Sequence, residues 1–133
     1  MKKFLTLIFL VTSFVSHAQK DVKLSVDWVF KNIIEGYDHN NKVSIFIDGV
    51  LVGESSVGLQ SKKNSMTVKV SQGKHDVRVV DYAYYQGEWQ EHTKDNEYSV
   101  DAFYQDRLDF RKKPRKISMV FDIDTEEATI KVK

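Results

Sequence analysis

The chain has 133 residues, no cysteine and a nearly balanced charge, with 20 Lys and Arg against 19 Asp and Glu. The absence of cysteine excludes disulfides, thiol catalysis and thiolate metal sites. The near-neutral balance argues against nucleic acid as the main partner, because binding to a phosphate backbone requires a clear excess of positive charge.

The first eighteen residues have the three parts of a secretory signal peptide. Lys2 and Lys3 precede an uncharged run of twelve residues, Phe4 to Val15, and small residues at Ser16 and Ala18 follow. A helix of that length spans roughly 18 Å, too short for a hydrocarbon core about 30 Å thick. Cleavage near Ala18 is therefore expected, whereas the alternative is a buried N-terminal strand or helix.

Cleavage leaves residues 19–133, which we expect to form one domain in the periplasm or in the secreted fraction, with no transmembrane segment. The loss of Lys2 and Lys3 changes the formal net charge from +1 to −1. Without disulfides, such a domain must be stabilised by its hydrophobic core.

Apolar and polar residues alternate along most of the mature segment, which predicts half-buried strands. The predicted strands are Val22–Phe30, Val43–Ile47, Val50–Val52, Met66–Val70, His75–Val79, Tyr98–Ala102, Ile117–Ile123 and Ala128–Val132. Asp48-Gly49 suits the positive φ angles of a tight hairpin turn. Three more turns are predicted, at Ser71–Lys74, at Gln86-Gly87 and at Asp124–Glu127, and the first and last of these are expected to close hairpins.

Helical signals are weak. Lys31–Tyr37 and Ala102–Phe110 each fit one or two helical turns, but neither has a matching cap and stop. Seven to nine short strands separated by turns predict an all-β fold. We expect an antiparallel β-sandwich of immunoglobulin-like type, with a small barrel as the alternative.

Two blocks of sequence carry a family resemblance. Val43–Gly53 (VSIFIDGVLVG) holds a strand, an Asp-Gly turn and a second glycine, and Val68–Val79 (VKVSQGKHDVRV) holds a strand, a glycine turn and a strand. With these blocks, Val43 to Tyr82 resembles the PEGA family of small extracytoplasmic β domains. The chain departs from the family at Glu54–Ser56, where the family has Thr-Pro. The resemblance implies a PEGA-like sandwich in a cell-envelope setting and no catalytic residue.

The sequence contains no recognisable catalytic or metal-binding motif, and no cofactor or metal is predicted. His39, His75 and His92 have no spacing that places two imidazoles on one face, and His75 is expected to be a partly buried, hydrogen-bonded histidine. Asp122–Glu127 contains alternating carboxylates, but it lacks the glycine of a calcium loop and is typical of a hairpin turn.

A basic cluster surrounds Pro114, the only proline. Its members are Arg111, Lys112, Lys113, Arg115 and Lys116. Proline fixes φ and removes a donor, so the cluster is interpreted as a solvated loop leading into the Ile117 strand. As a functional patch, it would face lipopolysaccharide, phospholipid head groups or an acidic partner.

Aromatic residues gather between Tyr82 and Tyr98, among carboxylates and amides. The parity of Tyr82 and Tyr84 predicts that both lie in the core and that Tyr85 points outward. The predicted binding residues are Tyr85, Glu88, Trp89 and Glu91. Flat aromatic faces beside hydrogen-bonding groups suit a glycan or a peptide, although these aromatics would also fill a small core.

These features predict a non-enzymatic module of the cell envelope that binds protein or glycan through the Tyr85–Trp89 loop. A first alternative is a structural or accessory subunit that pairs through a sheet edge at Val22–Phe30. A second alternative is a small hydrolase without a recognisable motif.

Overall fold

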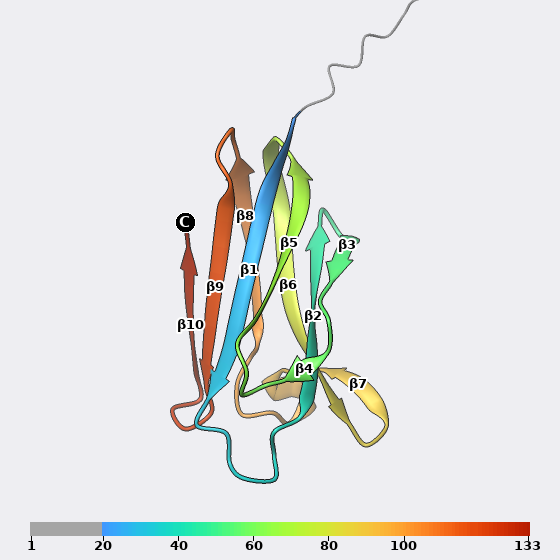
Figure 1. Cartoon of the computed structure of the whole chain (residues 1–133), viewed down its shortest axis with the longest axis vertical. Coiled ribbons are helices and arrows are strands. Elements are labelled where there is room, and N and C mark those ends of the chain that lie inside the picture. The colour runs from blue at the N-terminus through green and yellow to red at the C-terminus, as the bar shows by residue number, and fades with distance from the viewer. Residues whose placement is uncertain (1–19) are drawn as a thin grey trace, which may run out of the picture.

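The computed structural model describes residues 20–133, so the predicted signal peptide lies outside the described residues. The described part forms ten strands and one short 3-10 helix, η1 (Lys94–Asn96), arranged as two facing sheets (Figure 1). The prediction of an all-β sandwich is confirmed. Over residues 20–133, no helix has the length and apolar character needed to cross a membrane.

The four-stranded sheet is built around β1 (Asp21–Lys31). Its order is β10 (Glu127–Val132), β9 (Arg115–Asp122), β1 and β5 (Asn64–Ser71). β1 pairs with β5 in antiparallel fashion and with β9 in parallel, so one pair of the sandwich departs from the antiparallel pattern. Because β1 has partners on both sides, the predicted edge pairing through Val22–Phe30 is excluded.

The six-stranded sheet is built around β6 (Gly73–Tyr85). β2 (Asn40–Ile47) pairs with one side of β6, and β3 (Val50–Glu54) and β4 (Gly58–Leu59) pair with β2. The other side of β6 is shared by β8 (Phe103–Phe110), along its first part, and β7 (Glu88–Glu91), along its last part.

Two predicted turns have the expected backbone geometry. Asp48 and Gly49 have φ angles of 51° and 79°, and Gln86 and Gly87 have φ angles of 51° and 80°. Positive φ at both central residues matches the twist of a two-residue hairpin. The β2–β3 hairpin is therefore confirmed, and β6 and β7 form a further hairpin at the predicted Gln86-Gly87 turn. The β9–β10 hairpin at Asp124–Glu127 is confirmed as well.

The predicted hairpin between Met66–Val70 and His75–Val79 is wrong. β5 pairs with β1, whereas β6 pairs only with strands of the other sheet, so the connection after Ser71 crosses from one sheet to the other. Gly73 has φ of 122° in this connection, a conformation that residues with a β-carbon rarely adopt. A glycine turn fits a hairpin and a crossing equally well, and only the partner strands decide between them.

The predicted elements differ from the structure at three further places. Ala102–Phe110 is not helical, because β8 pairs with β6 over eight residues and buries Leu108 and Phe110. Tyr98–Ala102 is a loop rather than a strand, and Lys31–Tyr37 is the end of β1 followed by a loop. Tertiary pairing therefore overrides weak local signals in this chain.

Alternate side chains of both sheets fill the space between them. The largest fully buried apolar side chains are Trp28, Phe30, Phe110, Phe121, Leu24, Ile45, Ile117 and Met119. At one end of the sandwich this apolar core gives way to buried polar side chains, among them Asn41, Asp81 and His92. This end of the molecule carries the candidate site.

Replacing Gly53 in β3 tests how closely the two sheets approach each other. A β-carbon at Gly53 would lie 2.7 Å from Cγ1 of Val68 and 3.1 Å from Cε of Met66, both on β5. We expect Gly53→Ala to lower the free energy of unfolding by about 1–3 kcal/mol in urea denaturation, because overpacking forces neighbours apart. Gly58→Ala is the control, since its β-carbon would lie 3.7 Å from Nδ2 of Asn64. Equal losses in both variants would contradict the prediction.

Candidate functional site

The β6–β7 hairpin divides the four predicted binding residues between two opposite faces. Tyr85 lies opposite Glu88 in the register, and Tyr84 lies opposite Trp89. Because opposed residues share a face and successive residues alternate, Tyr85 and Glu88 lie on one face, and Trp89 and Glu91 lie on the other. All four do not form one binding surface.

The face with Trp89 is occupied by contacts within its own sheet. The Tyr84 and Trp89 rings lie 5.1 Å apart, and Nζ of Lys42 lies 4.7 Å from the Trp89 ring centroid. Glu91 accepts a hydrogen bond of 3.0 Å from the Arg78 guanidinium. Trp89 and Glu91 therefore stabilise the outer face of the hairpin.

The prediction that Tyr82 and Tyr84 lie in the core is wrong. Tyr82 is half-buried and Tyr84 is exposed, whereas Asp81 and Ala83 between and beside them are fully buried. Val77, Val79, Asp81 and Ala83 occupy successive inward positions of β6. The core side of this strand therefore carries the Asp81 carboxyl group, and the two tyrosines lie on its other side.

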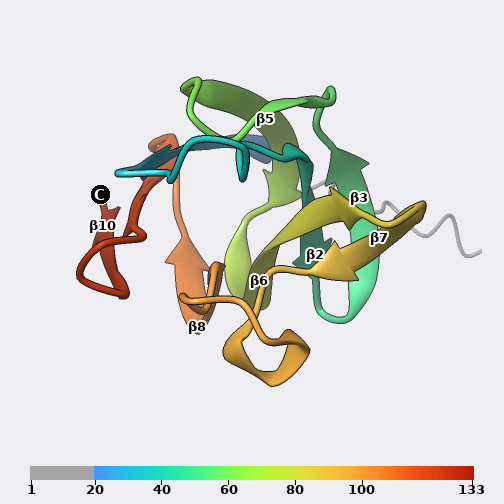
Figure 2. The same ribbon diagram turned by 90° about the horizontal axis from the view of Figure 1, so that it is seen from below.

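The other face of the hairpin borders a cleft at the end of the sandwich, the end that Figure 2 views from below. The loop before β2, the hairpin and the segment after β7 surround it, and its volume is about 730 Å³. Its aromatic lining residues are Tyr37, His39, Tyr85 and Tyr98. Its main polar lining residues are Glu88, Gln90, Asp95, Asn96 and Glu97.

An inner cavity of about 310 Å³ adjoins this cleft and shares four of its lining residues. Its additional walls are apolar at Ile33, Ile34 and Ile123 and polar at Gln60 and His92. Both volumes fall in the range of roughly 300–1,000 Å³ that is typical of small-molecule sites.

The charges around the cleft favour some ligands over others. Neither lysine nor arginine lines the cleft or the inner cavity, as far as residues 20–133 are concerned. The carboxylates Glu88, Asp95 and Glu97 do line the outer cleft. An anionic ligand would therefore meet like charge, so the site suits a neutral or positively charged ligand.

Contacts among the aromatic walls hold them in place. The rings of His39 and Tyr85 meet edge to face at 5.3 Å, and the ring of Tyr98 stacks on His92 at 4.4 Å. The Tyr98 hydroxyl donates a hydrogen bond of 3.2 Å to Oε1 of Gln90. Burial raises the pKa of Tyr98, so its phenol keeps the proton and remains a donor at neutral pH.

A buried polar group lies beneath the aromatic walls. Asn41 donates a hydrogen bond to Oδ2 of Asp81, and Nε2 of Gln60 donates to Nδ1 of His92 at 3.3 Å. Burial raises the pKa of Asp81 well above its usual range, although the Asn41 hydrogen bond opposes this shift. Burial, with a smaller contribution from His39, lowers the pKa of His92 to about 4.

Burial therefore acts on Asp81 and His92 in the same sense, since it favours the uncharged form of each side chain. Nδ1 of His92 lies 3.9 Å from Oδ1 of Asp81, a separation that fits an ion pair, but the burial of both groups favours their uncharged forms. Oδ1 of Asp81 and Nε2 of His92 have no hydrogen-bond partner within residues 20–133. A histidine with a pKa near 4 is a weak base at neutral pH, so this arrangement favours binding over acid–base catalysis.

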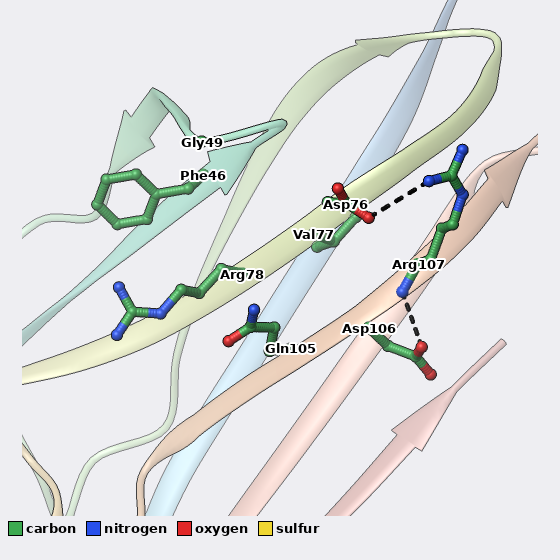
Figure 3. A pocket seen from close by; sticks show the side chains of 8 residues that line it. All are labelled: Phe46, Gly49, Asp76, Val77, Arg78, Gln105, Asp106 and Arg107. Carbon is green, nitrogen blue, oxygen red and sulfur yellow. Dashed lines mark hydrogen bonds and ion pairs between the residues drawn. The ribbon is translucent and has the colours of Figure 1, made fainter.

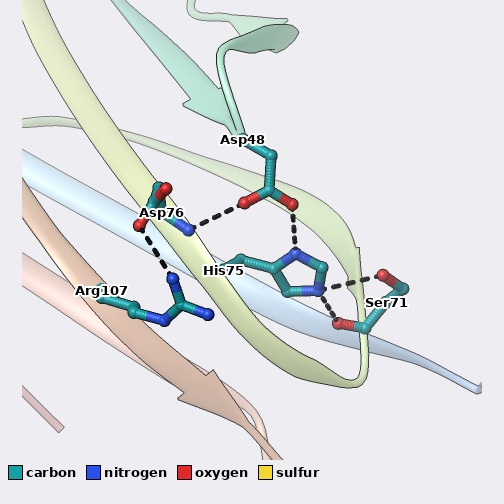
Figure 4. Close-up of polar contacts among 5 residues, drawn as sticks. All are labelled: Asp48, Ser71, His75, Asp76 and Arg107. Carbon is teal, nitrogen blue, oxygen red and sulfur yellow. Dashed lines mark hydrogen bonds and ion pairs between the residues drawn. The ribbon is translucent and has the colours of Figure 1, made fainter.

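A second constellation, at the opposite end of the sandwich, has the residue types of a hydrolase triad (Figure 4). Nδ1 of His75 lies 2.6 Å from Oδ2 of Asp48, and Nε2 lies 3.1 Å from Oγ of Ser71. Nε2 also lies 2.9 Å from the Ser71 carbonyl oxygen, which can only accept. The Ser71 carbonyl oxygen thus competes with the Ser71 hydroxyl for Nε2, whereas in a triad Nε2 accepts from the serine hydroxyl alone, so the geometry does not match that of a triad.

The constellation has a structural role instead. The hydrogen bond from His75 is the main cause of the lowered pKa of Asp48, whose other oxygen accepts from the Asp76 amide. These bonds join the β2–β3 turn to the connection between the two sheets. The prediction of a partly buried, hydrogen-bonded His75 is confirmed.

A groove of about 500 Å³ on the outer face of the six-stranded sheet is lined by charged residues (Figure 3). Arg78 pairs with Glu91 at 3.0 Å, and Arg107 pairs with Asp76 at 3.8 Å. Because both guanidinium groups have carboxylate partners, this groove offers little net charge to a ligand.

The predicted basic loop is only partly free of contacts. Arg111 pairs with Asp109 at 3.0 Å, and Arg115 donates to the carbonyl oxygens of Asp109 and Lys133. Lys116 pairs with Asp27 at 3.3 Å. Arg115 and Lys116 belong to β9 rather than to the loop, which leaves Lys112 and Lys113 as exposed cations without an ion pair among the described residues.

The alternating carboxylates near the C-terminus serve the β9–β10 hairpin. Asp122 accepts hydrogen bonds from Nδ2 of Asn32 at 2.9 Å and from the amides of Asp124 and Thr125. Within residues 20–133, no group of three or more His, Asp or Glu side chains is placed to hold a metal ion.

Sequence reasoning finds Tyr85 and Glu88 of the cleft and misses most of its other walls. Tyr37 and His39 come from the loop after β1, and Tyr98 comes from the segment after β7, so only the fold brings them together. The sequence did contain one signal of this site. Asp81 has the same parity as Val77 and Val79, so a carboxyl group stands where the alternation predicts an inward apolar residue.

Comparisons with known proteins add little. No family model and no curated protein matches the chain, so the PEGA resemblance remains a prediction. Listeriolysin O is similar over 86% of this chain and 23% of its own, with 16% identity and a TM-score of 0.36. A putative cell adhesion protein from Bacteroides ovatus ATCC 8483 is similar over 86% of this chain and 44% of its own, with 10% identity and a TM-score of 0.35.

The chain thus spans less than half the length of both solved structures. At these TM-scores, neither likeness carries an argument about function.

Asp81→Asn tests whether the buried carboxyl is neutral. Asparagine keeps an oxygen for the Asn41 hydrogen bond and cannot ionise. Because the folded pKa of Asp81 lies above its model-compound value of 3.8, the unfolded chain releases this proton first as pH rises. Wild-type stability then falls by up to about 1.4 kcal/mol per pH unit between the two pKa values. We expect the variant to be the more stable protein in urea denaturation, with a larger difference at about pH 8 than at about pH 5.

Asp122→Asn is the matched control, because hydrogen bonds from Asn32 and two amides lower the pKa of this exposed carboxyl. In the wild type, the charged Asp122 stabilises the fold at pH values above the pKa of this group in the unfolded chain. We therefore expect Asp122→Asn to be less stable than the wild type at neutral pH, and this difference to shrink as the pH falls below that pKa. A stability difference for Asp81→Asn that does not grow with pH would contradict the neutral carboxyl.

Proposed function

We propose that this protein is a non-enzymatic module of the cell envelope that binds a neutral saccharide in the cleft at the end of its sandwich. The observation that carries the proposal is the lining of the cleft, where Tyr37, His39, Tyr85 and Tyr98 alternate with amides and carboxylates. Sugar rings present apolar C–H faces that stack on aromatic rings, and their hydroxyls donate to carboxylates and accept from amides.

The chemistry of the lining supports a saccharide over most other ligands. The cleft carries carboxylates and no lysine or arginine among the described residues, which disfavours acidic sugars, phosphates and nucleotides. The low pKa of His92 keeps that ring neutral, so it adds no positive charge for an anion. A basic peptide would satisfy the same charges, and it is the outcome against which the saccharide is tested.

The envelope setting rests on the predicted signal peptide and on the PEGA resemblance. A domain in that compartment meets polysaccharides at high local concentration. Its cleft is built from loops at one end of a rigid sandwich, as in many binding modules in which a scaffold positions variable loops.

Tyr85 and Tyr84 provide a matched pair of variants. They are adjacent in the hairpin and equally exposed, at 42% and 43%, but they lie on opposite faces. The mature chain is screened on an array of neutral, N-acetylated, carboxylated and sulfated oligosaccharides, and the strongest binder is titrated by calorimetry. We expect a neutral or N-acetylated sugar to bind, Tyr85→Ala to weaken it about tenfold, and Tyr84→Ala to change affinity less than about twofold.

Three results would overturn this proposal. The first is binding confined to carboxylated or sulfated sugars, and the second is an equal loss of affinity in both tyrosine variants. The third is an array without any binder combined with binding of a Lys- and Arg-rich peptide, which would replace the saccharide with a basic peptide.

A further inference from the structure

The charges of this protein are separated between the two ends of the sandwich. Asp21 of β1 lies opposite Ser71, Leu24 lies beside Arg115, and Gly73 lies opposite Phe110. The register therefore brings the start of β1, the β5–β6 connection and the β8–β9 loop to one end, at the top of Figure 1. We call this the basic end, and its exposed or half-exposed cations are Lys20, Lys23, Lys69, Lys74, Arg111, Lys112 and Lys113.

Two of the acidic residues of the basic end are engaged by its basic side chains, whereas Asp21 is an exposed carboxylate beside Lys20 in the chain, so the cations still outnumber the acids there. Asp48 is bound to His75, and Asp109 pairs with Arg111. Lys23 and Lys69 lie directly opposite each other in the β1–β5 register. Like charges in that position repel and destabilise a sheet, so this pair adds positive potential without stabilising the fold.

The cleft end has the opposite sign. Its exposed carboxylates include Glu35, Glu88, Asp95, Glu97, Asp124, Glu126 and Glu127. Lys62 and Lys94 are among the few cations there, and neither makes an ion pair among the described residues. The formal net charge is near zero, but positive charge gathers at the basic end and negative charge at the cleft end. The molecule therefore has an electric dipole along its strands.

The N-terminal side of the chain enters the fold at the basic end. Lys20 is the first described residue, and the apolar run Phe4–Val15 ends five residues before it. Cleavage at the predicted site after Ala18 would place a new α-ammonium group one residue before Lys20 in the chain, and so add a cation to this end.

We propose that the basic end binds the surface of an anionic phospholipid bilayer and so directs the saccharide cleft away from the membrane. Lys112 and Lys113 at the tip of the β8–β9 loop are the principal contacts. Clustered cations near a bilayer are attracted by its negative surface potential over about a Debye length, ~8–10 Å. β6, with thirteen residues, spans roughly 40 Å, which holds the acidic cleft beyond the reach of that potential.

Flotation with lipid vesicles tests this orientation. The mature chain, residues 19–133, contains every strand of both sheets. It is mixed with phosphatidylcholine vesicles that contain or lack phosphatidylglycerol. The double variant Lys112→Gln/Lys113→Gln is compared with Lys62→Gln/Lys94→Gln, which removes the same charge from exposed positions at the cleft end. We expect binding only with phosphatidylglycerol, a loss of about tenfold or more in the first variant, and less than about twofold in the second.

The proposal is overturned by equal losses in the two double variants, because binding would then reflect net charge alone. It is also overturned by equal binding to vesicles without phosphatidylglycerol, or by binding to lipopolysaccharide or DNA with none to phosphatidylglycerol vesicles. The saccharide titration contains no lipid, so its outcome is independent of this one.

Discussion

The site in this protein depends on the unbroken register of β6. Over thirteen residues this strand pairs with β2 on one side and with β8 and then β7 on the other. Its inward positions run from Val77 and Val79 to Asp81, so the same alternation that fills the core also buries a carboxyl group. The strand then continues past the core into the hairpin that borders the cleft.

The burial of Asp81 has consequences for its neighbours. Burial raises the pKa of the carboxyl group and so favours its protonated form, and it lowers the pKa of the nearby His92 ring to about 4. The neutral His92 ring lies between Phe30 and Tyr98, at 4.7 Å and 4.4 Å, and supports the aromatic wall above it. The polar layer thus separates the apolar core from a cleft open to solvent.

The two ends of the sandwich have different chemistry because the strands connect loops of different composition. One end gathers cations beside the start of β1, and the other gathers aromatic rings and carboxylates. A parallel β1–β9 pair contributes to this separation, because it places the basic β8–β9 loop beside the first residues of the described chain. The strands of both sheets run between these two ends and keep their side chains apart.

Alternation and turn chemistry in the sequence determined the all-β class, most of the strands and three of the hairpin turns. Those features are local, because period-two burial and positive φ are properties of a few adjacent residues. Only the tertiary structure decided that β5 and β6 belong to different sheets, that β1 is a central strand and that β8 is a strand. It also decided that Tyr85 and Trp89 face opposite ways, and that Tyr37, His39 and Tyr98 share a cleft. Each of these depends on which distant segments pair, and strand pairing is set by the burial and hydrogen bonding of the whole chain rather than by its local pattern.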